Sequence, residues 1–183
     1  MNRFIFADSN KCIGCRTCEV ACVMAHGDGD IAQITQYQFS PRIHVVKGFS
    51  VSTAVVCRQC EDAPCATVCP NAAITRKNDF IYVDQQKCIG CKTCVVACPY
   101  GTMEVVTKVV VSDDHALSGG LNTRAQANKC DLCHTRDVGP ACVEVCPTKA
   151  LVVMDRNAID QMVQEKRRRA ALDTSVSGSF LNF

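Results

Sequence analysis

Sixteen cysteines, arranged as four complete sets of four, constrain this 183-residue chain more than any other feature. Thiols at this density either form disulfides or bind metal. Aromatic residues make up only 5% of the chain and tryptophan is missing, so bound metal would replace part of the usual apolar interior. The four sets are Cys12, Cys15, Cys18 and Cys22; Cys57, Cys60, Cys65 and Cys69; Cys88, Cys91, Cys94 and Cys98; and Cys130, Cys133, Cys142 and Cys146.

The N-terminal segment argues against a disulfide framework. Secreted disulfide-rich proteins carry signal peptides, but MNRFIFADSNKC has neither an apolar signal-peptide core nor a twin-arginine pair. No apolar run approaches the ~18 to 20 residues that span a bilayer, since Thr107 and Lys108 interrupt the valine-rich stretch 105–111. The sequence therefore predicts a cytoplasmic chain with reduced thiols and no transmembrane segment.

The spacing of the cysteines fits iron–sulfur clusters better than zinc. A structural zinc site takes its ligands as two pairs separated by a long loop. The first and third sets instead read C-x2-C-x2-C-x3-C, the spacing of bacterial 4Fe–4S ferredoxins, in which the fourth cysteine binds the neighbouring cluster. On a helix, Cys18 and Cys22 lie about 6 Å apart along the axis, so the last thiol reaches a different cluster. We expect four 4Fe–4S clusters, with zinc or disulfides as the alternatives.

Connection lengths favour two nested ferredoxin-like modules in an α+β fold. Eighteen residues separate Cys69 from Cys88, whereas the connections 23–56 and 99–129 each exceed thirty. A compact two-cluster module requires the short connection, which joins the second set to the third. The alternative pairs the first set with the second and the third with the fourth. The expected units are an inserted module at 55–107, a split outer module at 1–54 and 108–155, and a C-terminal helix and tail at 156–183.

In the nested arrangement, each cluster takes three ligands from one set and the fourth from its partner set. The predicted ligands are Cys12, Cys15, Cys18 and Cys146 for cluster 1; Cys22, Cys130, Cys133 and Cys142 for cluster 2; Cys57, Cys60, Cys65 and Cys98 for cluster 3; and Cys69, Cys88, Cys91 and Cys94 for cluster 4.

Short β-prone runs flank the cysteine sets, and short helices are expected to carry the last two cysteines of each set. Segments 27–37 and 112–128 are polar and are expected to be surface connections. A polar helix is expected over 157–172, and its basic run 166–169 is interpreted as a solvated face rather than a nucleic-acid site. The expected strands are Phe4–Ala7, Ile43–Val46, Ala73–Thr75, Phe80–Val83, Met103–Val111 and Ala150–Met154.

Positive side chains recur beside the cysteines. Lys11, Lys87 and Lys129 each precede the first cysteine of a set. Such cations stabilise the more negative, reduced form of a cluster and raise its reduction potential. The alternative is that these lysines are ordinary solvated side chains. His134 follows Cys133 but is interpreted as a neighbour of a complete ligand set. Tyr100 is expected to pack on a cluster.

Several segments resemble those of a known family: MNRFIFADSNKCIGCRTCEVAC, VCRQCEDAPCATVCPNAAI, CIGCKTCVVACPYG, KCDLC and GPACVEVCPTKAL. They are similar to the iron–sulfur electron-transfer subunits of molybdopterin or tungstopterin oxidoreductases, the family of the dimethyl sulfoxide reductase B subunit. The resemblance is closest to cytoplasmic members of formate dehydrogenase and hydrogenase complexes, of the formate hydrogenlyase or hydrogen-dependent CO2 reductase type. It covers about residues 1–155. Proline follows the last cysteine in the other three sets, but the first set has Val23, a change expected to leave ligation intact.

This resemblance implies an electron-transfer subunit whose partner is a catalytic formate dehydrogenase subunit. The sequence contains no Gly-rich dinucleotide loop, nucleophile motif or spare cysteine, so the chain is expected to be non-catalytic. It would relay electrons to or from a hydrogenase or a second iron–sulfur subunit. The alternative function is an accessory protein for maturation or assembly of such an enzyme. The C-terminal helix and tail are expected either to dock on another subunit, with self-assembly as one form of this, or to end in a disordered tail.

Overall fold

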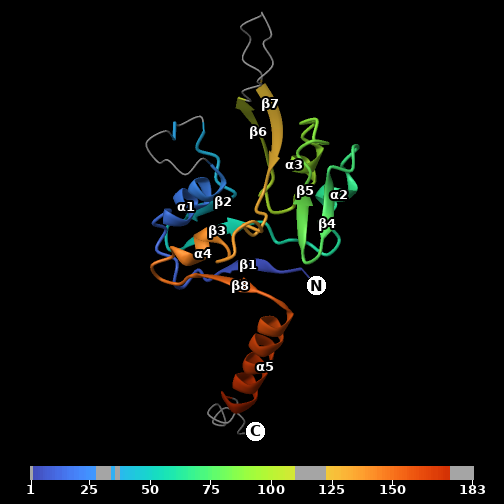
Figure 1. The fold of residues 1–183 in the computed structure, drawn as a ribbon. Coiled ribbons are helices and arrows are strands. Elements are labelled where there is room, and N and C mark those ends of the chain that lie inside the picture. The colour runs from blue at the N-terminus through green and yellow to red at the C-terminus, as the bar shows by residue number, and fades with distance from the viewer. Residues whose placement is uncertain (1, 28–33, 36–37, 110–122, 174–183) are drawn as a thin grey trace, which may run out of the picture.

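The computed structural model of the chain describes residues 2–27, 34–35, 38–109 and 123–173, and within them four two-stranded antiparallel sheets combine with short helices (Figure 1). This mixture of helix and strand agrees with the expected α+β class. The sheets pair β1 (Phe4–Ala7) with β8 (Leu151–Met154), β2 (Ile43–Lys47) with β3 (Ser52–Val56), β4 (Ile74–Lys77) with β5 (Phe80–Val83), and β6 (Glu104–Val109) with β7 (Thr123–Asn128).

The helices pack in two pairs that lie on opposite sides of the body. Helix α1 (Thr17–His26) contacts α4 (Ala141–Glu144), and α2 (Pro64–Thr67) contacts α3 (Thr93–Ala97) (Figure 1). The first pair thus joins the two ends of the chain, and the pairing of β1 with β8 does the same. The second pair joins segments from the middle of the sequence.

Two clusters of buried side chains form the core, and cysteines belong to both. The first contains Ile5, Ile43 and Leu151 together with Cys22 and other cysteines of the first and fourth sets. The second is built largely from the middle of the chain, where its members are Ala63, Ile74, Ile81, Val83, Cys94, Met103 and Ala127. Buried sulfur therefore occupies positions that larger apolar side chains fill in other small domains.

The length of each of these helices depends on whether a proline follows the last cysteine of its set. Helix α1 is ten residues long and carries both Cys18 and Cys22, as predicted. The prediction was wrong for the other three helices, which have four or five residues and end before the fourth cysteine of their set. The residue before a proline is driven out of helical geometry, and the fourth cysteine of these sets precedes Pro70, Pro99 or Pro147. Val23 imposes no such restriction, so α1 continues to His26.

Substituting proline for Val23 should therefore shorten α1. Proline inside a helix costs ~3 kcal/mol, which for a chain of this size lowers the apparent Tm by roughly 6 to 12 °C. Anaerobic thermal unfolding followed by circular dichroism measures the change. The matched control is Val23→Ala, which removes the same buried side chain but keeps the helix. Equal Tm values for the two variants would contradict this explanation of the length of α1.

The loops that carry the first and third sets have the same backbone conformation. Gly14 and Gly90 adopt φ angles of +68° and +70°, and Arg16 and Lys92 follow with 65° and 66°. A Cβ atom on Gly90 would lie 2.4 Å from the Cβ atom of Ala125 in β7. Glycine is therefore required at position 90 by both the positive φ and the close approach of strand β7.

Residues 123–128 were expected to be a surface connection, but they form strand β7. The pairing of Thr123 with Val109 through Asn128 with Glu104 overrides their polar composition. Strand β3 was also missed, and the predicted module boundary at 107 falls inside β6. Residues 110–122, most of segment 27–37, and the tail from 174 onward lie outside the described residues.

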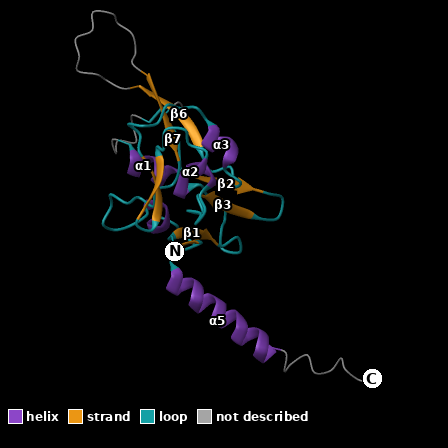
Figure 2. Ribbon diagram, turned by 90° about the vertical axis from the view of Figure 1, so that its right-hand side faces the viewer, coloured by secondary structure: helices purple, strands orange, loops and turns teal. Residues whose placement is uncertain are grey.

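Helix α5 (Arg156–Asp173) confirms the predicted C-terminal helix. It follows β8, contacts that strand, and projects away from the rest of the molecule in both views (Figures 1 and 2). Most of its side chains are exposed, including the basic run Lys166–Arg169. Among the described helices, none has the length and apolar character required to cross a membrane.

Candidate metal centres

Three hollows in the structure are each lined by four cysteines. Each encloses about 330 to 360 Å³ of empty space, part of which is open to solvent, and its other walls are mostly apolar. We name each set of four by its first cysteine. The Cys12 group is Cys12, Cys15, Cys18 and Cys146; the Cys57 group is Cys57, Cys60, Cys65 and Cys98; and the Cys69 group is Cys69, Cys88, Cys91 and Cys94.

The remaining four cysteines form the Cys22 group, which consists of Cys22, Cys130, Cys133 and Cys142. All four are buried, because α1 and α4 pack against each other and the loop 129–134 lies beside them. The thiol of Cys142 lies close enough to those of Cys22 and Cys133 for their charges to raise its pKa. The structure thus brings together the same four sets of cysteines that connection lengths suggested. Their ligation of iron stays a prediction.

Hydrogen-bond donors point at the sulfur atoms in matching positions. The backbone N–H groups of Ala73 and Ala150 donate to Cys69 and Cys146, each over 3.3 Å and each from four residues further along. The hydroxyl of Thr17 lies 3.3 Å from the sulfur of Cys15, and that of Thr93 lies 3.1 Å from the sulfur of Cys91. Donors aimed at sulfur stabilise thiolate, the form that binds metal. The sites therefore suit a metal–thiolate centre better than neutral thiols.

Burial opposes this ionisation in the absence of a cation. It raises the pKa of the Cys18 and Cys65 thiols to about 11 and that of Cys142 to about 12, and it also raises the pKa of Cys130. A bound metal ion reverses this effect because coordination deprotonates the thiol. Thiols gathered in groups of four, some of them buried, thus form donor sets that a cationic centre would stabilise.

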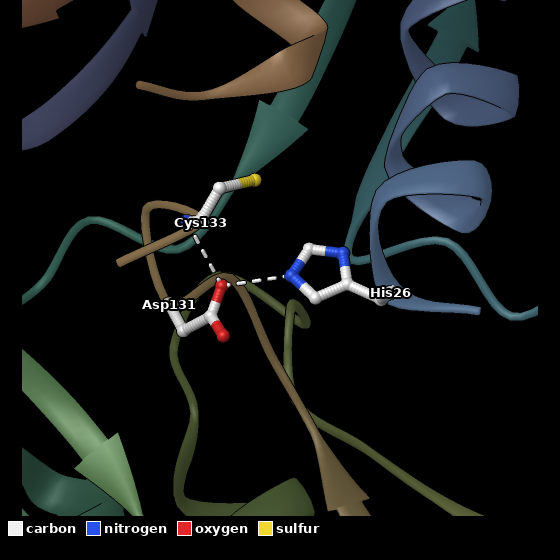
Figure 3. A group of neighbouring side chains, drawn as sticks. All are labelled: His26, Asp131 and Cys133. Atoms are coloured by element: carbon white, nitrogen blue, oxygen red, sulfur yellow. Dashed lines mark hydrogen bonds and ion pairs between the residues drawn. The ribbon is translucent and has the colours of Figure 1, made fainter. Parts of the chain in front are cut away.

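An ion-pair network centred on Asp131 lies beside the Cys22 group (Figure 3). Its carboxylate accepts hydrogen bonds from His26 Nε2 at 3.0 Å and from Arg42 Nη1 at 2.6 Å. Burial lowers the pKa of His26, but hydrogen bonds to Asp131, Cys133 and Cys22 outweigh that effect and raise it to about 11. Both ring nitrogens face acceptors, since Nδ1 lies 2.8 Å from the backbone oxygen of Cys22. The network therefore places positive charge next to these sulfurs.

The atoms of His26, Asp131 and Cys133 lie within 4.8 Å of one another, a distance at which such side chains could share a metal ion. Both oxygens of Asp131 are instead occupied by His26 and Arg42, and the cation on Arg42 disfavours a metal ion there. His134 also pairs with Asp131, at 3.4 Å, and stacks on Phe80. We interpret these residues as supports of the Cys22 group.

The three lysines that precede a cysteine set differ in their exposure to solvent. Lys11 and Lys87 are exposed and pair with Asp8 and Asp84 at 3.8 and 3.9 Å. Lys129 is buried and lines the hollow of the Cys57 group, as does Tyr100. Gln59 was not singled out in the sequence, although it lies within a C-x2-C gap.

Gln59 is almost fully buried and connects segments that are distant in the sequence. It donates to the backbone oxygen of Cys130 over 2.8 Å and accepts from the backbone N–H of Ile81 over 2.9 Å. Its backbone φ angle of 50° is positive, as is that of Leu132 in the matching gap of the fourth set. These contacts of Gln59 are visible only in the structure, because a single glutamine in the sequence does not indicate them.

Comparison with known proteins places these features in a family. Two family models, each described as a 4Fe–4S binding domain, match residues 9–25 and 80–103. The chain is 62% identical over 176 residues to the electron transport protein HydN of Escherichia coli K12, covering 94% of this chain and 99% of the relative. It is 64% identical over 150 residues to a probable iron–sulfur subunit of the Frd operon of Proteus vulgaris, covering 82% and 96%.

A third relative is formate hydrogenlyase subunit 2 of Escherichia coli K12, which is 37% identical over 190 residues and is matched over 91% of this chain and 89% of its own length. The match to HydN covers 94% of this chain, so it extends over all four cysteine sets. The chain therefore belongs to the family of ferredoxin-type 4Fe–4S electron-transfer proteins of the formate hydrogenlyase type that includes HydN.

Proposed function

We propose that this chain holds four 4Fe–4S clusters and relays electrons between two partners, a hydrogenase or similar redox protein and a molybdopterin or tungstopterin formate dehydrogenase subunit. Its family and its 4Fe–4S binding domains make it a non-catalytic electron carrier of formate and hydrogen metabolism. Bound clusters would supply one-electron exchange at the sites that the cysteines form. The proposed setting is the cytoplasm, where thiols stay reduced.

The observation that carries this proposal is the gathering of all sixteen cysteines into four groups of four. In each group, one cysteine comes from a distant set, as in bacterial ferredoxins with two clusters. Proposed ligands are therefore the members of the Cys12, Cys22, Cys57 and Cys69 groups. The hydrogen bonds to sulfur and the apolar walls of the hollows support this assignment.

Nesting of two modules is the architecture that we propose for these groups. The Cys12 and Cys22 groups draw on the two ends of the chain, and the Cys57 and Cys69 groups draw on residues 57–98. The two helix pairs follow the same division, and the two apolar clusters follow it in large part, except that Val56 and Phe80 belong to the first cluster and Ala127 to the second. The modules approach each other where Cys57 lies close enough to Cys130 to affect its ionisation. This junction is the proposed crossing point for electrons between the modules.

Helix α5 is the proposed contact with a neighbouring subunit, including a second copy of the chain. It projects from the body, and its half-buried residues Ile159, Met162 and Val163 share one face. An amphipathic helix of this kind gains stability when its apolar face is covered.

Anaerobic purification of the tagged full chain from its native cells tests the partners. We expect two companions to copurify in fixed stoichiometry: a hydrogenase or second iron–sulfur protein, and the catalytic formate dehydrogenase subunit. A chain that ends at Asp155 should lose at least one companion while it keeps its iron. Substoichiometric binding that occurs only to immature enzyme would instead support the accessory or maturation function.

A further inference from the structure

Lys129 is a buried positive charge at the junction between the two modules. Its relative exposure is 3%, whereas the side chains of Lys11 and Lys87, which hold the equivalent place before their own cysteine sets, are 58% and 60% exposed. Charged side chains are rarely buried to this extent without a compensating partner. The position therefore calls for a specific explanation.

Three hydrogen bonds hold the side-chain nitrogen of Lys129 in place. The Nζ atom donates to three oxygens: Gln59 Oε1 at 3.4 Å, the backbone oxygen of Cys130 at 2.7 Å, and the backbone oxygen of Ile81. An ammonium group has three N–H donors, so it satisfies all three acceptors.

Two groups of sulfur atoms surround this ammonium. Lys129 lines the hollow of the Cys57 group, and through the backbone it is bonded directly to Cys130 of the Cys22 group. That hollow is lined by Cys57, Cys60, Cys65 and Cys98, and the Nζ atom of Lys129 also donates to the backbone oxygen of Cys130 over 2.7 Å. One cation thus acts on cysteines of both modules.

Gln59 holds this cation in place from the inserted module. Its side-chain oxygen accepts from Lys129 and from Ile81 N, and its amide donates to Cys130 O, so the same residue fixes both sides of the junction. Asn2 adds a hydrogen bond of 2.6 Å to the backbone oxygen of Gln59. The ammonium is therefore preorganised and does not depend on a flexible, solvated side chain.

We propose that Lys129 is a shared tuning residue that raises the reduction potentials of the clusters held by the Cys57 and Cys22 groups together. This inference rests on the proposed function, because it assumes clusters at both groups. The step that it serves is the transfer of one electron between the two groups, with no proton transfer and no bond made or broken. Because one charge acts on both sides, both potentials rise, and the electron can cross the junction without a large uphill step.

The test is an anaerobic redox titration of the full chain, followed by electron paramagnetic resonance. In Lys129→Met, which keeps the length of the side chain and removes its charge, we expect two of four midpoint potentials to fall. Each fall should be at least tenfold in the reduction equilibrium constant, or about 59 mV for one electron. The other two potentials should stay within threefold of the wild-type constants.

Two further variants distinguish the effect of the Lys129 charge on the potentials from the effect of a structural change at the junction. Lys87→Met removes an exposed, solvent-screened lysine at the equivalent position, so its shift should stay below threefold. Gln59→Leu breaks the hydrogen bonds of the junction but keeps the ammonium, so it should move the potentials less than Lys129→Met does. If Lys129→Met loses iron, Gln59→Glu provides a second test, since it places a carboxylate against the ammonium and should lower the same two potentials.

Unchanged potentials in an iron-replete Lys129→Met, or equal shifts in Lys87→Met, would overturn the inference. Loss of iron in both Lys129→Met and Gln59→Glu would also overturn it, because the role of Lys129 would then be structural. A wild-type chain that lacks four reducible centres would contradict the proposed function itself. The wild-type titration therefore distinguishes the two failures.

Discussion

Replacing Cys142 with serine is expected to remove one reducible centre and about four of about sixteen irons per chain. Cys142 is buried in α4 and faces Cys22 and Cys133, so no water or solvent-exposed side chain can replace its thiolate easily. The remaining three cysteines would keep an incomplete cluster at most. Iron and acid-labile sulfide per chain, together with the paramagnetic spectrum of the reduced protein, measure this loss.

The same variant distinguishes the two ways of pairing the cysteine sets. In the nested arrangement, Cys22→Ser and Cys142→Ser abolish the same centre, so the double variant loses no more iron than either single variant. Cys98→Ser is the matched control, because its centre is a different one and its iron loss should add to that of Cys142→Ser. In the sequential arrangement, Cys98 and Cys142 would share a centre. Additive losses for Cys22 and Cys142 would therefore contradict nesting.

Removal of the iron should unfold the chain rather than leave a folded apoprotein. Cys18, Cys22, Cys130 and Cys142 belong to the first apolar cluster, and Cys94 belongs to the second. Without metal, the thiols of each group would face one another with no ion to join them. Metal binding is coupled to folding in such small units. After anaerobic chelation, we expect loss of the cooperative thermal transition and increased binding of an apolar dye.

Reconstitution gives the control for this prediction. Iron and sulfide added under reducing conditions should restore the transition, whereas zinc should not, because a structural zinc site takes its four ligands as two pairs separated by a long loop. Helix α5 lies outside both apolar clusters and should contribute little to either result. An apoprotein that retains its cooperative thermal transition would contradict this prediction, because the fold would then be stable without clusters.

The sequence predicted the strands best where apolar residues are concentrated. Runs Phe4–Ala7 and Phe80–Val83 match β1 and β5, and the polar helix expected at 157–172 matches α5 within one residue at each end. Strand β7 was missed because the only apolar residues of TRAQAN are two alanines, which favour strands weakly, and its pairing with β6 holds it extended. Helix lengths were overestimated where a proline follows the fourth cysteine, although that proline was visible in the sequence.

At the candidate metal centres, most of what the sequence predicted came from the spacing of the cysteines. The family resemblance to electron-transfer subunits is confirmed by relatives that are 62% and 37% identical and are matched over 94% and 91% of this chain. The groups of four that line the hollows are those expected from connection lengths, but cluster binding at each group stays a prediction.

The surroundings of the sulfurs were less predictable. Lys11, Lys87 and Lys129 look equivalent in the sequence, yet of the three only Lys129 is buried, because Gln59 and Ile81 from a distant part of the chain accept hydrogen bonds from it. The network of His26, Arg42 and Asp131 joins three segments far apart in the chain and leaves no local pattern. Long-range contacts of this kind depend on the fold as a whole.

The iron stoichiometry of anaerobically purified full-length chain tests the central claim most directly. Four clusters predict about sixteen irons and sixteen sulfides per chain, together with four one-electron centres in a reductive titration. Stoichiometric zinc, disulfide-bonded cysteines, or an iron content well below that value with fewer than four reducible centres would contradict the account.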